Sequence, residues 1–185
     1  MSGFNALRAV TDTLESLIEA DLGIAVDKDH SPHAISGDTA LLSVYLYRVE
    51  PNPFLANLEW QSVGASQVVA PPLGLNLHYL FTPYGPDQPE IQRTLGELMR
   101  LFHEQPVIRV GHPALSPDLA SMTEELRITP HALPFADLMD LWKSFYNVPY
   151  RLSVTYEVSA VLIDSRETRN VARVQERHVE LGMLR

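Results

Sequence analysis

The chain has 185 residues and a formal net charge of −9, and it contains no cysteine. The length fits one domain, and the lack of cysteine excludes disulfides, thiolate catalysis and cysteine-ligated zinc. An acidic chain disfavours nucleic-acid binding, which needs a basic face, and the sequence has no apolar run of about 18 residues that would span a membrane.

The first predicted elements are a helix and two strands. Apolar residues recur every three or four positions over residues 4–22, and Gly23 then supplies a natural helix end. The short apolar run Ile24–Val26 predicts an edge strand. Residues 40–50 predict a central strand because both of its faces are largely apolar. The prolines of residues 51–54 end it, since proline cannot donate to a strand ladder.

The middle of the chain predicts a loop, a strand and a helix. Residues 55–71 are expected to be loop, with a short extended piece near Gln67–Val69. Residues 73–85 predict a third strand with alternate apolar residues on one face. Residues 89–104 predict a helix with proline in its first turn. Residues 107–110 then predict a short strand.

The last part of the body predicts a strand, a helix and a long final strand. The strand covers residues 125–129, and the helix covers residues 134–145 with Leu138, Leu141, Trp142 and Phe145 facing inward. From Arg151 to Leu162 apolar and polar residues alternate, which predicts a strand with one solvent-exposed face. Twelve residues at about 3.3 Å each would reach about 40 Å.

This order of elements favours an α+β fold, with a mixed, mainly antiparallel sheet of about four to six strands flanked by three helices. Residues 1–165 are expected to form the domain, and residues 166–185 an arginine-rich arm or an added strand. The arm holds five arginines against three glutamates, a balance of +2, so the remaining residues carry −11. A basic arm on an acidic body favours contact with other copies or with an acidic partner.

The polar side chains do not form a known catalytic motif. Asp29, His30 and His33 come nearest to a metal-ligand cluster, but no further ligand lies close in the sequence, and a solvated loop explains them. His78 lies opposite the apolar face of its strand, so we expect it at the surface or an interface. Asp137 and Asp140 have nothing beside them to act on. We therefore expect no enzyme activity, no cofactor and no metal site.

The corner formed by residues 51–55 has two interpretations. It is either a simple proline turn or a rigid corner that presents Phe54 and Leu55 to a neighbouring subunit. The arginines of the arm either keep it soluble or contact acidic groups on a partner. The residues expected at an interface are Phe54, Leu55, Arg151, Arg166, Arg169, Arg173 and Arg177.

Four stretches together resemble a known family: VYLYRVEPNPF at 44–54, PPLGLNLHYLFTPYG at 71–85, QRTLGELMRLFHEQPVI at 92–108 and DLWKSFYNVPYRLSVTYEVSAVLIDS at 140–165. In this order they are similar to the N-terminal domain of cap, or tail-terminator, proteins. These proteins belong to extracellular contractile injection systems, the phage-tail-like particles of the antifeeding-prophage and virulence-cassette type. The resemblance covers residues 5 to 165.

The resemblance implies an α/β tail-terminator fold and a structural role. A cap of this family is expected to form a six-fold ring on the distal end of the inner tube and contractile sheath, which ends their growth. The implied partners are further copies of the chain and the tube and sheath proteins. Assembly is expected in the cytoplasm, since Asp12, Glu15 and Glu19 interrupt any signal peptide, within a particle that can be released from the cell.

Two alternatives stay open from the residues. A baseplate or sheath adaptor of the same kind of particle would carry a similar arm. A small-ligand or metal-binding enzyme would use His30, His33 or Asp137.

Overall fold

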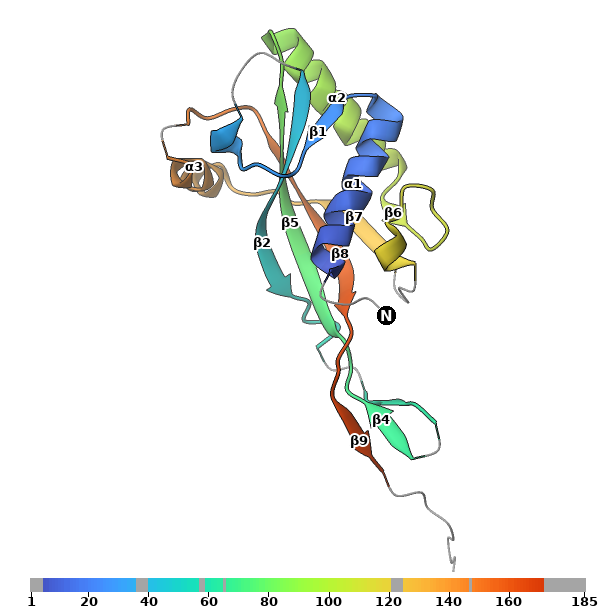
Figure 1. Cartoon of the computed structure of the whole chain (residues 1–185). Coiled ribbons are helices and arrows are strands. Elements are labelled where there is room, and N and C mark those ends of the chain that lie inside the picture. The colour runs from blue at the N-terminus through green and yellow to red at the C-terminus, as the bar shows by residue number, and fades with distance from the viewer. Residues whose placement is uncertain are drawn as a thin grey trace, which may run out of the picture.

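The computed structural model describes residues 5–35, 40–56, 59–64, 66–120, 125–146 and 148–171. A six-stranded mixed sheet in the order β1–β2–β5–β8–β7–β6 forms the body, and a three-stranded sheet in the order β3–β4–β9 extends from one end of it (Figure 1). The strands are β1 (Ala25–Asp27), β2 (Leu41–Pro51), β3 (Gln61–Ser62), β4 (Gln67–Val69), β5 (Leu73–Tyr84), β6 (Val107–Ile108), β7 (Leu126–Pro130), β8 (Val154–Ile163) and β9 (Thr168–Asn170). The helices are α1 (Ala6–Leu22), α2 (Gln88–Glu104) and α3 (Phe135–Ser144), with 3-10 turns at Pro32–Ala34 and Pro117–Leu119.

Helices cover both faces of the large sheet, which confirms the predicted α+β fold. The main core lies between the sheet and helices α1 and α2. On the other face, α3 packs over a smaller cluster of Leu80, Trp142 and Phe145. Strand β2 contributes Val44 to the main core and Tyr45 to the smaller cluster, so its two apolar faces are explained by burial on both sides.

Local signals set the ends of the first two helices. Gly23 ends α1 with a left-handed φ of 65°, which glycine adopts without steric cost. The Asp87 side chain accepts a hydrogen bond of 2.9 Å from the Glu90 backbone N–H at the start of α2, and proline occupies its first turn. The predicted limits of both helices are therefore correct to within two residues.

A bulge in β8 contradicts the predicted unbroken alternation. The register with β5 changes from Leu77↔Val158 to Leu75↔Val161, so β8 holds one more residue than its partner. The extra residue is accommodated where Ala160 has a φ of 64°. As a result Val161 joins the main core, and the residues after the bulge face opposite sides from those predicted. The strand is also shorter than predicted, with ten residues.

The region predicted as loop contains two of the three strands of the second sheet. The extended piece at Gln67–Val69 is confirmed as β4, whereas β3 was not predicted. Among the described residues, no helix is long and apolar enough to cross a membrane.

Candidate assembly surface

The three short strands β3, β4 and β9, here called the extension, project from the end of the body where β2 ends and β5 begins (Figure 1). Strands β3 and β4 form a hairpin, and β9 pairs with β4 from Gln67↔Asn170 to Val69↔Thr168. The Ala70 N–H also donates to the Glu167 carbonyl at 2.9 Å. The first residues of the arm therefore form a strand within this chain, and those from 172 onward lie outside the described residues.

The extension has little buried surface of its own. All residues of β3 and β9 are exposed, and Val63 and Val171 beside them expose much of their apolar side chains. A small sheet without a well-buried face is marginally stable alone in water. Strands β3 and β9 are also its two edges, and edge strands present backbone groups that can pair with another chain.

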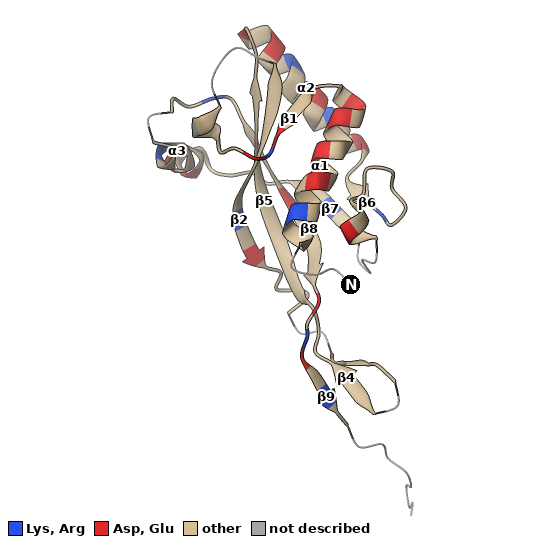
Figure 2. Ribbon diagram, viewed as in Figure 1, with Lys and Arg blue, Asp and Glu red and all other residues tan. Residues whose placement is uncertain are grey.

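One aromatic contact fastens β9 to the segment before β3. The Arg169 guanidinium lies 4.1 Å from the centroid of the Trp60 ring, and its Nη2 donates to Glu167 Oε1 at 2.7 Å. A cation over an indole face is favourable by about 0.5–1 kcal/mol at exposed sites. Arg169, predicted to contact a partner, therefore makes contacts within its own chain. In Figure 2 the basic part of β9 is blue.

Asn52 fixes the shape of the corner. Its Oδ1 accepts the Phe54 N–H at 2.9 Å, and its Nδ2 donates to Asn76 Oδ1 at 2.8 Å. Phe54 is left 91 % exposed. Leu55 turns back onto its own chain, because a Cβ built at Gly74 would lie only 2.5 Å from Leu55 Cβ. The corner therefore presents Phe54 outward and holds Leu55 against β5.

A pocket of about 380 Å³ lies between this corner and the connection from β8 to β9, with Leu55, Pro72 and Ile163 among its lining residues. Arg166 is an exposed residue of that connection. The corner, Arg166 and the extension thus lie at the same end of the molecule. Four of the predicted interface residues lie at this end: Phe54, Leu55, Arg166 and Arg169.

The predicted interface residue Arg151 lies elsewhere. The Arg151 guanidinium is 4.6 Å from the centroid of the Tyr84 ring, at the far end of β5 from the corner. The ten residue steps from Gly74 to Tyr84 correspond to about 33 Å along a strand. Arg151 therefore belongs to a different surface from Phe54. Arg173 and Arg177 lie outside the described residues.

Two exposed aromatic residues near α3 were missed in the sequence. Phe135 and Tyr146 are 68 % and 85 % exposed, and the Phe135 ring lies 6.1 Å from that of Tyr150. In the sequence, Tyr146 directly follows the inward-facing Phe145, and Phe135 lies at the start of the predicted helix. Trp60 was also missed, because its function depends on pairing with Arg169 more than a hundred residues away.

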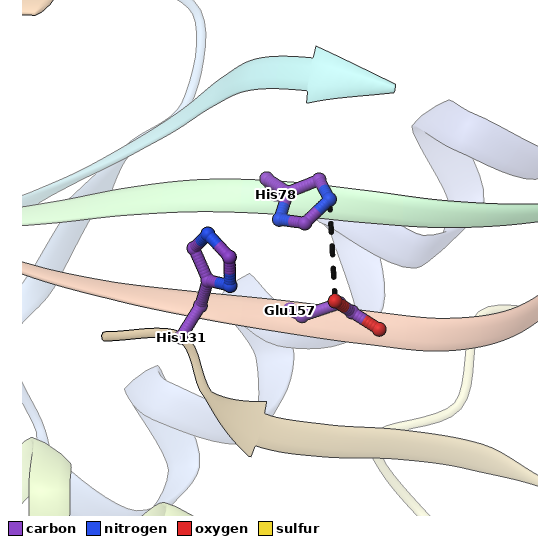
Figure 3. Close-up of side chains that lie close together, drawn as sticks. All are labelled: His78, His131 and Glu157. Carbon is purple, nitrogen blue, oxygen red and sulfur yellow. Dashed lines mark ion pairs between the residues drawn. The ribbon is translucent and has the colours of Figure 1, made fainter. Parts of the chain in front are cut away.

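A polar cluster lies on the face of the sheet that α3 covers. His78 is only 2 % exposed, and its Nε2 lies 3.0 Å from Glu50 Oε2 and 4.0 Å from Glu157 Oε2. The His131 ring lies beside it, with centroids 4.7 Å apart (Figure 3). The expected surface position of His78 is therefore wrong, because a central strand between two helical layers buries both of its faces.

Tyr47 lies next to this cluster, with its ring centroid 6.0 Å from that of His78. Burial raises the pKa of the Tyr47 phenol, and the nearby Arg48 partly opposes this effect. The phenol is therefore neutral at physiological pH and adds no charge to the cluster.

Comparison with known proteins identifies related folds. A family described as the Pvc16 N-terminal domain matches residues 9–177. The PVC sheath/tube terminator, solved in its extended state in an extracellular contractile injection system, is similar with a TM-score of 0.69 at 16 % identity over 97 % of this chain. The tube-terminating cap of the anti-feeding prophage gives a TM-score of 0.66 at 18 % identity over 93 % of this chain.

At these identities the likeness establishes a shared fold. The chain spans 64 % and 60 % of the lengths of these two proteins. No curated protein matches it at a significant level.

Proposed function

The chain belongs to the family described as the Pvc16 N-terminal domain, and on this basis we propose that it is a structural cap of a contractile injection particle. It ends the growth of the inner tube and sheath by binding to their last ring. The likeness of its fold to a sheath/tube terminator and to a tube-terminating cap supports this role.

The observation that carries the proposal is the exposed extension. A growing tube ends in a ring whose binding surface is unfilled, and a terminator must fill that surface without offering a new one. Strand β9 is an edge strand with exposed side chains, and it lies at the same end of the molecule as the exposed Phe54. Such a strand can extend a sheet in a neighbouring subunit, where main-chain hydrogen bonds supply affinity.

In this proposal several copies form a ring, six by family resemblance, with tube and sheath subunits as partners. The role needs no catalytic residue and no cofactor. The cap domain is residues 1–165, and the arm is residues 166–185. The gap between the end of β8 at Ile163 and the start of β9 at Thr168 supports a boundary in this connection. The cap is added in the cytoplasm, before the particle is released.

The proposal is tested in particle-producing cells that lack this chain. Particle length is measured by electron microscopy after complementation with the wild type, Asn170→Pro or Asn170→Ala. In the β4–β9 ladder the backbone groups of residues 167 and 171 bond to β4, so the N–H of Asn170 faces the outer edge. Proline removes that donor and leaves the pairing with β4 intact.

We expect uniform particles with the wild type and with Asn170→Ala, and long, irregular particles with Asn170→Pro. Uniform particles with Asn170→Pro would contradict pairing through β9. Uniform particles without any copy of the chain would contradict the terminator role itself. A labelled copy found at the baseplate would contradict the cap role and support the role of a baseplate adaptor.

A further inference from the structure

Three segments bring possible metal ligands together on the α3 face of the sheet. His78 comes from the middle of β5, His131 directly follows β7, and Glu157 comes from β8. One ligand atom from each residue lies within 4.8 Å of the others (Figure 3). The sequence gives no sign of this group, because its members are separated by 53 and 26 positions and meet only through strand pairing.

The hydrogen bonds of His78 prepare one of its nitrogens for a ligand. Glu50 is a carboxylate and can only accept, so the 3.0 Å contact requires His78 Nε2 to carry a proton. His78 Nδ1 is buried and has no hydrogen-bond partner among the described residues. A metal-binding histidine normally donates its other N–H to a carboxylate, which is the arrangement of Glu50 and His78.

A protonated imidazole explains this geometry less well. A second proton would place an N–H donor at the buried Nδ1, again without an acceptor among the described residues. An unsatisfied buried donor is unfavourable. A metal ion bound at Nδ1 takes up the lone pair of this nitrogen, so no unpaired polar group remains. A proton bound there would instead leave an unpaired N–H donor.

We propose that His78, His131 and Glu157 bind one divalent transition-metal ion of the Zn²⁺ class. Two imidazoles and one carboxylate are a ligand set that zinc uses, with a fourth position left for water. Zinc ligands at about 2.0–2.2 Å from the ion lie about 3.4 Å from one another. Ligand atoms up to 4.8 Å apart must therefore approach one another by up to about 1.4 Å. Glu157 Oε2 lies 4.0 Å from His78 Nε2, so the Glu157 side chain must also turn toward Nδ1. The half-buried His131 and Glu157 side chains can rotate to do so.

The charges around the cluster favour a cation. Glu157 and Glu50 each supply one negative charge, and Arg48 pairs with the outer oxygen of Glu50. Imidazoles bind a metal ion in their neutral form and then add no charge, and the neutral Tyr47 phenol adds none. The remaining charge of −1 attracts a divalent ion, which then ties β5, β8 and the segment after β7 into one unit.

The test uses the purified full chain, treated with a chelator and titrated with Zn²⁺ in a calorimeter. We expect one ion per chain and a higher melting temperature on binding. His131→Gln should weaken the affinity at least tenfold and abolish the rise in melting temperature. Glu50→Gln, which changes only the residue that orients His78, should weaken binding by about 10- to 100-fold.

His30→Gln is the matched control, because His30 is an exposed loop histidine whose ring contacts the nearby Asp27. It should retain the affinity of the wild type. Circular dichroism establishes that each variant is folded, and Glu157→Gln replaces His131→Gln if the latter is not. Absence of saturable binding to the wild type, or wild-type affinity in a folded His131→Gln or Glu157→Gln variant, would overturn the proposal.

Discussion

At the residue scale, Gly74 determines how closely the corner packs against the body. A Cβ at this position would lie 2.5 Å from Leu55 Cβ and 2.9 Å from its Cδ1. Gly74→Ala should therefore displace Leu55 and lower the free energy of unfolding by about 1–3 kcal/mol. Urea denaturation of the purified chain measures this difference.

Gly96 provides the matched control for this substitution. It lies inside α2, and a Cβ there would meet nothing within 4 Å. Gly96→Ala should raise the free energy of unfolding by about 0.5–1 kcal/mol, since alanine is the better helix former. If Gly74→Ala raised the free energy of unfolding as much as Gly96→Ala does, the close approach of Leu55 to Gly74 would not be a stabilising feature.

At the element scale, the contact between Trp60 and Arg169 should control how often β9 separates from β4. Trp60→Ala removes a cation–π contact of about 0.5–1 kcal/mol. The Ala70 and Val171 amides, which bond across the β4–β9 pair, should then exchange hydrogen about two- to fivefold faster. Trp60→Phe should have a smaller effect, because it keeps an aromatic face. Unchanged exchange in Trp60→Ala would show that strand pairing alone holds β9.

Hydrophobic periodicity predicted the elements that bury a regular apolar face. All three helices and strands β2, β5 and β7 were found because one or two apolar faces repeat along them. The bulge at Ala160 could not be found in this way, because one extra residue reverses the faces without changing the composition. Strand β3 was also missed, since a two-residue strand exposed on both faces has no apolar pattern.

The candidate surface was predicted only in part, because it depends on long-range pairing. The exposed Phe54 follows from the proline corner, which is a local signal. The contacts of Arg169 depend on Trp60, and those of His78 depend on strands β2 and β8. Such contacts arise from sheet register, which short stretches of sequence do not specify.

At the scale of the whole molecule, the acidic residues of α1 and α2 lie away from the exposed apolar corner at Phe54. Acidic side chains gather on α1 and α2 (Figure 2), where Lys28 pairs with Asp12 and Glu15, and Arg100 pairs with Asp21. Arg100 is exposed, and a pair of that kind adds little stability, whereas the Lys28, Asp12 and Glu15 side chains are partly buried. The acidic helices repel one another between copies, so a ring is better formed through the corner end than through these helices.

This argument predicts which surface holds copies of the chain together. The wild type should form a concentration-dependent assembly larger than a monomer, measured by light scattering on a sizing column. Phe54→Ser should weaken it at least tenfold, because burying a phenylalanine contributes about 1.5–3 kcal/mol. Phe135→Ser removes an aromatic residue of similar exposure near α3 and should leave the assembly unchanged. Weakening by Phe135→Ser alone would place the contact at α3, and a wild type that stays monomeric would contradict the proposed self-assembly.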